Sequence, residues 1–353
     1  MKLVKTRILT RDGGKVEAFA PTVLSVSRAT DIPAFYTEWF FNRLDEGYCK
    51  WRNPFDGLES YVSFEKVRFI VFWSKNPAPM IPYLERLKRI GMNCYVQYTL
   101  NDYESEGLEP GVPAIKQRVE TFIQLAEFLG SQGVVWRFDP MILTDKISIS
   151  ELLQKVSSIA DRLQGYTDTL VFSFADIAGY RKVHRNLTSH GIRYEEWTDS
   201  KMREFSSLLS LLNKKRCWNL KLRTCAERID LSEFGIEHSR CVDDERIARI
   251  AYHDGRLMTE LGLQIHEPSL NLFGEDEMRP IDAISLPDGR YAMRIAKRKD
   301  SGQRQLCGCI KSKDIGQYDI CPHGCLYCYA NISPESARRN HARHNPHSEM
   351  VIL

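Results

Sequence analysis

The stretch VRFIVFWSKN, Val67–Asn76, indicates the fold class of this chain, because a run of apolar residues ends there in three polar ones. A continuous run rich in Val, Ile and Phe is typical of a strand that is buried on both faces of a parallel sheet. Helical periodicity follows over Pro79–Ile90. The stretch therefore predicts a strand followed by a helix.

The same pattern recurs over residues 21–224. Five further strands are predicted at Thr22–Ser27, Asn93–Thr99, Gly133–Phe138, Thr169–Phe174 and Trp218–Arg223. Further helices are predicted between them, at Pro33–Gly47, Pro113–Leu129, Ser150–Leu163 and Thr198–Lys214. Alternating strands and helices predict an α/β fold with a parallel sheet, and right-handed crossovers permit either a barrel or an open doubly wound sheet.

Polar side chains gather at the C-terminal ends of nearly all these strands, which favours the barrel. In a (β/α) barrel those ends face one cavity, whereas an open sheet concentrates its site at one switch point. We therefore expect a parallel (β/α) barrel, full or partial, with six to seven βα units. The candidates for binding a cofactor or substrate are Ser27, Arg28, Lys75, Asn76, Gln97, Arg137, Ser173 and Arg223. The arginines suit carboxylate or phosphate groups, although a polar residue can also simply begin a loop.

The flanking segments suggest four parts. Residues 1–20 predict a hairpin around Asp12-Gly13-Gly14 that caps the barrel of residues 21–224. The segment 225–310 contains a helical stretch at Asp243–Leu261 and a second hairpin signal at Pro287-Asp288-Gly289. Residues 311–353 are expected to form a cysteine-bearing C-terminal extension, with a cysteine loop and a basic tail.

Composition excludes several classes of protein. The 353 residues are 43% hydrophobic and 27% charged, which excludes a disordered or collagen-like chain. The formal net charge of +3 is too small to imply a polyanionic partner. No run approaches the roughly 18 apolar residues that span a bilayer, and the opening MKLVKTRILTRDGG alternates charged and apolar residues. We expect a soluble, cytoplasmic protein without a membrane partner.

The cysteines carry the most specific signal. In a reducing compartment, ten cysteines suggest metal chemistry before disulfides. Cys321, Cys325 and Cys328 form CxxxCxxC within YDICPHGCLYCYAN, residues 318–331. Three thiolates can hold three irons of a [4Fe–4S] cluster and leave the fourth iron open to a small molecule. Zinc is the alternative, and it requires a fourth ligand such as His323.

With Tyr327 as its aromatic residue, this motif resembles the CxxxCxΦC hallmark of the radical S-adenosylmethionine (SAM) superfamily. The resemblance implies that SAM chelates the open iron and is cleaved reductively to methionine and a 5′-deoxyadenosyl radical, which abstracts hydrogen from a substrate. It also implies a full or partial (β/α) barrel, Tyr327 at the cofactor site, and a reducing partner such as a flavodoxin or ferredoxin.

The chain departs from that superfamily in the position of the motif, which lies near the end of the sequence and not after the first strand. A Gly-Gly-Glu stretch, which often binds the SAM amino group there, has no obvious counterpart. A circularly permuted barrel is therefore expected, with Gln317–Ile320 as the strand that carries the cluster loop beside the N-terminal strand.

A second set of cysteines comprises Cys225, Cys241, Cys307 and Cys309. Four thiols are the complement for a closed [4Fe–4S] or zinc site. Because Cys225 directly follows a predicted strand, we expect this site at the catalytic face. Several radical SAM branches carry auxiliary clusters, so the resemblance implies a second cluster, with a zinc staple or free thiols as alternatives.

The alternative function is a metal-stapled protein that binds or modifies nucleic acid, with zinc or iron–sulfur as the metal group. The basic, histidine-rich tail from Arg338 to His347 favours it, although a solvated terminus has the same composition. The YCYA context also faintly resembles relatives of spore photoproduct lyase, which act on DNA. The substrate is thus expected to be a small molecule or a nucleic acid.

Overall fold

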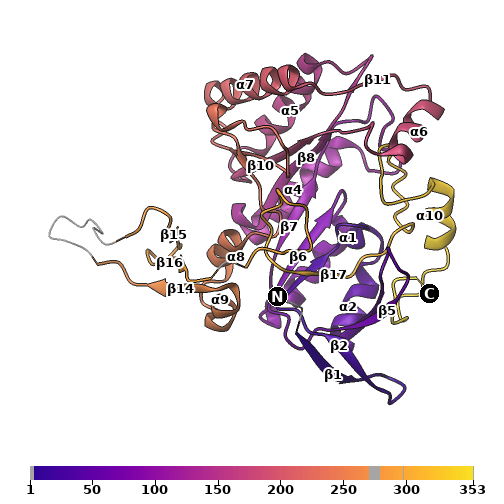
Figure 1. The fold of residues 1–353 in the computed structure, drawn as a ribbon, viewed down its shortest axis with the longest axis vertical. Helices are drawn as coiled ribbons and strands as arrows, with labels where there is room; N and C mark the ends of the chain where they lie inside the picture. The colour runs from indigo at the N-terminus through magenta and orange to yellow at the C-terminus, as the bar shows by residue number, and fades with distance from the viewer. Residues whose placement is uncertain (1–3, 270–278, 297, 353) are drawn as a thin grey trace.

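The computed structural model describes residues 4–269, 279–296 and 298–352 (Figure 1). Its centre is a sheet of eight strands in the order β13-β12-β10-β8-β7-β6-β3-β17, with every neighbouring pair parallel. The strands are β3 Val23–Val26, β6 Phe69–Ser74, β7 Asn93–Thr99, β8 Val134–Met141, β10 Thr169–Phe174, β12 Lys221–Thr224, β13 Glu237–His238 and β17 Lys313–Asp314.

The predicted α/β class and parallel sheet are confirmed, because all six predicted strands are present as β3, β6, β7, β8, β10 and β12. The expected closure of this sheet into a barrel is not confirmed. Within the described ranges no pairing joins β13 to β17, and each of these outer strands has only two residues. The sheet is therefore open between its two ends.

Helices cover one face of the sheet. Strand side chains alternate between faces, so Phe72 and Trp136 pack in one cluster with Phe122 of α4 and Val156 of α5, while Val71 faces the other way. The helices between β3 and β12 in the sequence are α1 Ile32–Phe35, α2 Thr37–Glu46, α3 Leu84–Arg89, α4 Ile115–Leu129, α5 Ile149–Leu163, α6 Arg181–Ser189 and α7 Asp199–Lys215, with the 3₁₀ helices η1 Ala78–Tyr83 and η2 Ser131–Gly133.

The segment after β12 covers the opposite face. Ile247 of α8 packs with Val71 and Tyr95 of the sheet, and the Tyr95 hydroxyl donates to the Cys241 carbonyl at 2.6 Å. The single helix predicted at Asp243–Leu261 is in fact two helices, α8 Asp244–Ala251 and α9 Gly255–Leu261. The break arises because the Asp254 side chain caps a new helix by accepting from the Leu257 amide.

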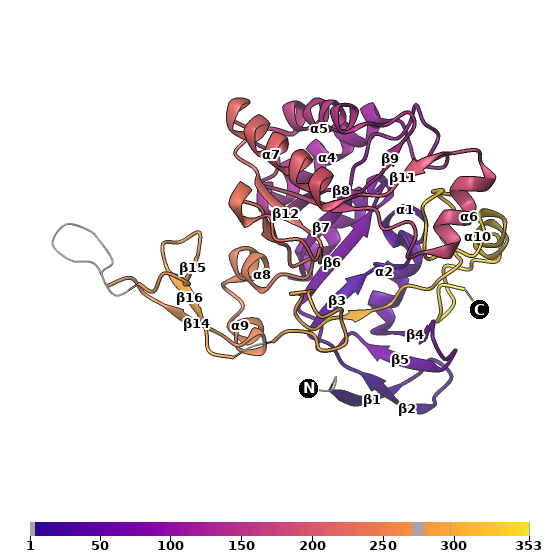
Figure 2. The same ribbon diagram turned by 45° about the horizontal axis from the view of Figure 1, so that its top comes forward.

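A small antiparallel sheet projects from the body of the molecule (Figures 1 and 2). It contains β14 Leu263–His266, β15 Ile284–Ser285 and β16 Tyr291–Arg294 in the order β14-β16-β15. The hairpin signal at Pro287-Asp288-Gly289 lies between β15 and β16, where Gly289 has a φ of 89°. The projecting sheet thus starts directly from the helices that cover the second face.

The N-terminal hairpin is present as β1 Lys5–Leu9 and β2 Lys15–Phe19, while residues 1–3 lie outside the described part. It continues into a four-stranded sheet, β1-β2-β5-β4, with β4 Tyr48–Arg52 and β5 Glu59–Ser63, which was not predicted. A second short pair joins β9 Leu143–Thr144 to β11 Tyr194–Glu195. None of the described helices is long and apolar enough to cross a bilayer.

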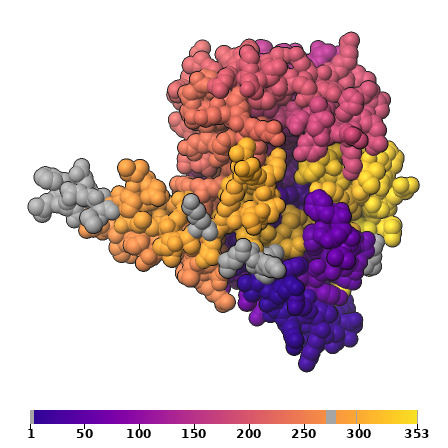
Figure 3. All heavy atoms as spheres, in the orientation of Figure 1, coloured from indigo at the N-terminus to yellow at the C-terminus, as the bar shows by residue number. Residues whose placement is uncertain are grey.

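The C-terminal segment returns to the start of the sheet. The strand beside β3 is Lys313–Asp314, so the prediction of Gln317–Ile320 was wrong in position, although the parallel pairing with the N-terminal strand is as expected. Helix α10, Pro334–His341, follows, and the space-filling view in Figure 3 shows the C-terminal residues packed on the body. Trp39 of α2 donates to the Ser348 carbonyl at 2.9 Å, so the tail is held against α2 and is not a freely solvated terminus.

Candidate metal centre

The loop that carries CxxxCxxC is fixed at the C-terminal edge of β3. The Ile315 amide donates to the Ser25 carbonyl at 3.3 Å, and the Trp51 indole donates to the Gly316 carbonyl at 2.9 Å. A Cβ at Gly316 would lie 1.7 Å from the Ser27 hydroxyl oxygen, so only glycine allows this approach. The Ser27 hydroxyl in turn donates to Asp314 of β17 at 2.8 Å. Ser27, which was expected to bind a cofactor or substrate, therefore contacts the strand that precedes the cysteine loop.

Cys321, Cys325 and Cys328 lie on one loop between β17 and α10. Cys325 is buried and the other two are half-buried, and Gly324 makes the turn between them with a φ of 68°. Burial raises the pKa of the Cys321 thiol to about 12 and that of Cys325 well above its usual value, and the neighbouring thiols add to both effects. A metal that stabilises the thiolates would offset this cost, and thiolates are the ligand type that iron–sulfur clusters and zinc take.

His323 lies inside the loop but is occupied elsewhere. Its Nε2 is 2.7 Å from the Asp31 carboxylate, and its Nδ1 is 3.1 Å from the Gly111 carbonyl oxygen. Asp31 also accepts from the Ser74 hydroxyl at 2.6 Å and from the Lys75 amide at 2.7 Å. Both ring nitrogens therefore have partners, and His323 is not a free fourth ligand for a metal in this loop.

Tyr327 is anchored in a buried polar cluster. Its hydroxyl donates to the Glu109 carboxylate and accepts from Lys75 Nζ at 2.8 Å and from Asn101 Nδ2 at 3.0 Å. Lys75 Nζ also pairs with Glu109 at 2.7 Å, and Arg118 lies 3.6 Å from the same carboxylate. Burial raises the pKa of Glu109, but Lys75 and Arg118 outweigh it and lower the pKa overall. This cluster positions the cysteine loop. It also engages the ammonium group of Lys75, which was expected to bind a cofactor or substrate.

A second network joins three of the predicted strand-end residues. Arg137 donates to the Cys241 sulfur at 3.2 Å, to the Gln97 side-chain oxygen at 3.3 Å and to Asp139. Gln97 donates to the Cys241 carbonyl at 2.8 Å, and the Ser173 hydroxyl donates to Asp139. Side chains from β7, β8 and β10 thus meet at one edge of the sheet.

The remaining predicted residues lie around this network. The Arg28 guanidinium lies over the Trp73 ring at 5.3 Å, and Arg137 lies over the same ring at 5.4 Å. Arg223 instead faces Asp243 at 3.6 Å, on the side of β13. The Asn76 amide donates to the Ser74 hydroxyl at 2.9 Å, which places Asn76 in the turn after β6.

Asn101 connects the two networks. Its side-chain oxygen accepts from the Asp139 amide at 2.9 Å, while its nitrogen donates to Tyr327. Sequence reasoning missed Glu109 and Arg118 because they lie in a loop and a helix, away from any strand end. It also missed Asn101, although this residue lies two positions after the end of β7. Asp314, which accepts from Ser27, was missed because its strand is too short to have a pattern.

The second cysteine set also gathers at this edge. The sulfurs of Cys225 and Cys241 are 3.6 Å apart, and the Cys309 sulfur accepts from the Val242 amide at 3.4 Å. In the part of the chain that the structure describes, no three His, Cys, Asp or Glu side chains are arranged to hold a single metal ion. The thiols are therefore adjacent without enclosing one point.

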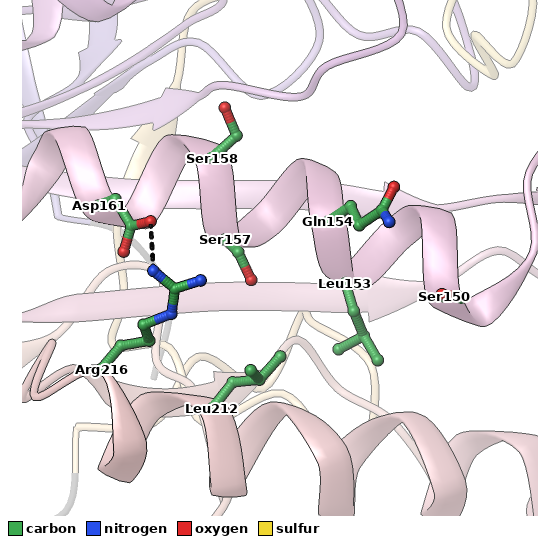
Figure 4. Close-up of a pocket in the computed structure, with 8 residues that line it drawn as sticks. All are labelled: Ser150, Leu153, Gln154, Ser157, Ser158, Asp161, Leu212 and Arg216. Atoms are coloured by element: carbon green, nitrogen blue, oxygen red, sulfur yellow. Dashed lines mark hydrogen bonds and ion pairs between the residues drawn. The ribbon is translucent and has the colours of Figure 1, made fainter.

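A surface groove of about 400 Å³ lies between α5 and α7 (Figure 4). Ser157, Asp161, Leu212 and Arg216 are among the residues that line it, and Arg216 pairs with Asp161 at 3.3 Å. No cysteine and no predicted site residue lines this groove. The helices that form it belong to the outer layer, so we do not assign the candidate site to it.

One family model, described as a domain of unknown function (DUF1848), matches residues 23–330. The matched range starts at β3 and includes both cysteine sets as well as the whole parallel sheet. No curated protein and no solved structure matches the chain.

Proposed function

The chain belongs to the DUF1848 family, and we propose that it is a radical SAM enzyme in which Cys321, Cys325 and Cys328 ligate a [4Fe–4S] cluster. The observation that carries the proposal is a set of three thiols on one loop, next to a histidine whose two ring nitrogens are already engaged. When bound, such a cluster supplies the electron for reductive cleavage of SAM to methionine and a 5′-deoxyadenosyl radical.

The number of thiols supports an open iron. A cubane has four irons, and this loop offers three sulfur ligands. In the part of the chain that the structure describes, no three His, Cys, Asp or Glu side chains, these thiols included, are arranged around a single metal ion. A zinc ion would require a fourth protein ligand, so the loop fits zinc less well than a cluster with one position left for SAM.

The sheet supports the same proposal. A (β/α) barrel places its reactive groups at the C-terminal ends of its strands, and the loop lies there at the end of β3. In this proposal the open eight-stranded sheet is a partial barrel, permuted so that the strand carrying the loop comes last in the sequence.

The surrounding residues would position the cluster loop more than they would contact SAM. Lys75, Gln97, Arg137 and Ser173 all have partners inside the protein. Tyr327 holds the loop from inside the protein through its hydroxyl. Tyr329, two residues later, is 48% exposed and marks the side of the loop that solvent can reach. SAM, substrate and a reducing partner such as a flavodoxin or ferredoxin would approach from that side.

The nucleic-acid function gains no support from the tail. His341 lies 3.0 Å from the Tyr36 hydroxyl, and His344 lies 2.7 Å from the Val351 carbonyl oxygen, so both histidines serve to pack the C-terminal segment. Arg338 and Arg339 are exposed on α10. Binding to DNA or RNA that weakens steeply with salt would nevertheless support it, because phosphate contacts release counterions.

The direct test is reductive SAM cleavage by the anaerobically reconstituted protein. With dithionite as the reductant, the wild type should release 5′-deoxyadenosine, and Cys321→Ala, Cys325→Ala and Cys328→Ala should each abolish release. Cys217→Ser is the matched control, because Cys217 is exposed and lies before β12. Unchanged product in all three alanine variants would show that the loop does not ligate a SAM-cleaving cluster.

A further inference from the structure

Four thiols from three separate segments converge beside the sheet. Cys225 directly follows β12, Cys241 precedes α8, and Cys307 and Cys309 lie in the segment before β17. Besides the 3.6 Å contact between Cys225 and Cys241, the Cys309 thiol interacts with those of Cys241 and Cys307. The thiols thus form a continuous row, although Cys225 and Cys309 are 84 positions apart in sequence.

The row is bordered by positive charge. Arg137 donates to the Cys241 sulfur at 3.2 Å, and Arg28, on the same Trp73 ring, lies close enough for Cys241, Cys307 and Cys309 to interact with it electrostatically. One terminal nitrogen of Arg28 is buried without a hydrogen-bond partner. A buried, unpartnered guanidinium nitrogen is costly, and negative charge on the neighbouring sulfurs would stabilise it.

Metal binding requires all four cysteines to be thiolates and would release the protons that the buried members hold. The two arginines lie where they would balance that charge.

We propose that Cys225, Cys241, Cys307 and Cys309 ligate a second metal centre, a [4Fe–4S] cluster closed by four thiolates. Zinc would hold four sulfurs around one point at about 2.3 Å, and within the described residues no three ligands are so arranged. A cubane takes each thiolate on a different iron, so the four sulfurs need not lie within bonding distance of one metal ion. Nitrogen donors to the ligand sulfurs, here Arg137 and the Val242 amide, are contacts that tune such clusters.

This centre lies at the same edge of the sheet as the CxxxCxxC loop. A chain of hydrogen bonds runs from Arg137 through Asp139 and Asn101 to Tyr327. The second cluster would therefore lie at the same edge of the sheet as the first, connected to it through Asn101. It rests on its own cysteines and does not depend on whether the first site cleaves SAM.

Iron, sulfide and zinc are to be counted after anaerobic reconstitution in the wild type, in the triple Cys321, Cys325 and Cys328→Ala variant, and in the quadruple Cys225, Cys241, Cys307 and Cys309→Ala variant. We expect roughly eight irons in the wild type and roughly four in each variant. The proposal would be overturned if the triple variant held zinc and no iron. It would also be overturned if the wild type held about four irons and the triple variant held none. Eight irons without SAM cleavage would overturn only the proposed function.

Arg28→Gln gives a measurement that keeps every cysteine. Loss of its charge should shift the midpoint potential of one cluster to a more negative value and leave the iron count unchanged, because the reduced cluster carries more negative charge. Arg279→Gln is the control, since Arg279 lies over Tyr291 in the projecting sheet. If the midpoint potentials of both clusters were unchanged in Arg28→Gln, no cluster would lie beside this guanidinium.

Discussion

The carboxylate of Asp314 accepts a hydrogen bond from the Ser27 hydroxyl at 2.8 Å, although 287 positions separate the two residues in sequence. Asp314 also accepts from the Ser25 hydroxyl at 2.8 Å and from the Arg28 amide at 2.9 Å. These bonds hold β17 against the end of β3. They explain how a cysteine motif near the end of the chain reaches the place beside the first strand of the parallel sheet.

Gly316→Ala should disrupt this junction. Its Cβ would meet the Ser27 side chain at 1.7 and 2.6 Å, which requires a backbone shift at the base of the cysteine loop. We expect a loss of several kcal/mol of unfolding free energy, on the order of the larger single-residue effects, measured by urea denaturation. Ser27→Gly in the same chain should recover part of it. Gly255→Ala is the control: its Cβ meets nothing within 4 Å at the start of α9.

Tyr327→Phe should destabilise the protein while leaving its fold intact. The variant removes the hydroxyl shared by Glu109, Lys75 and Asn101, and buried polar groups left without a partner cost about 1–3 kcal/mol. Anaerobic urea denaturation measures the change. Tyr329→Phe should have little effect, because its hydroxyl lies 3.5 Å from the Arg28 carbonyl on an exposed side chain. Equal losses in both variants would show that the buried cluster does not anchor the loop.

Lys75→Met should cost more, about 3–5 kcal/mol, because it leaves the Glu109 carboxylate buried with only Arg118 as a cationic neighbour. The matched control is Lys50→Met, which removes a pair with Glu59 whose side chains are 27% and 36% exposed. An exposed pair contributes less than about 1 kcal/mol. Similar losses for the two lysines in thermal or urea unfolding would contradict this account of Glu109.

His341 should make stability depend on pH. Burial and the neighbouring His344 lower its pKa from 6.5, so below about pH 6.5 the unfolded chain binds a proton that the folded protein does not. Stability should therefore fall as the pH drops through that value towards the folded pKa. In melting curves between about pH 7 and pH 5.5, His341→Gln should show a smaller fall than the wild type. His190→Gln, at an exposed position after α6, should retain the wild-type slope.

The fold was predictable where apolar runs are long. Strands Asn93–Thr99 and Thr169–Phe174 were predicted with the bounds that the structure shows, because both of their faces are buried. β4 and β5 were missed since they are partly exposed and lack a continuous apolar run. Closure was not predictable, because it depends on two-residue strands at the two ends of the sheet.

The candidate site was predictable in its location and much less in its contacts. Strand-end polarity located Gln97, Arg137 and Ser173, which the structure joins in one network. Their partners come from elsewhere in the sequence: Glu109 is a loop residue that becomes the counter-ion of Lys75 only after folding. Local sequence patterns carry no information on such long-range pairs.

The position of β17 also has a consequence for synthesis on the ribosome. Strands β3, β6, β7, β8, β10 and β12 are all translated before residue 313, so most of the parallel sheet can form while the chain is still growing. Until then β3 has β6 on one side and an unpaired edge on the other, and such an edge is prone to pairing with other chains. The CxxxCxxC loop follows β17 in sequence, so a nascent chain stalled before residue 313 would lack this loop and leave the outer edge of β3 open to aggregation.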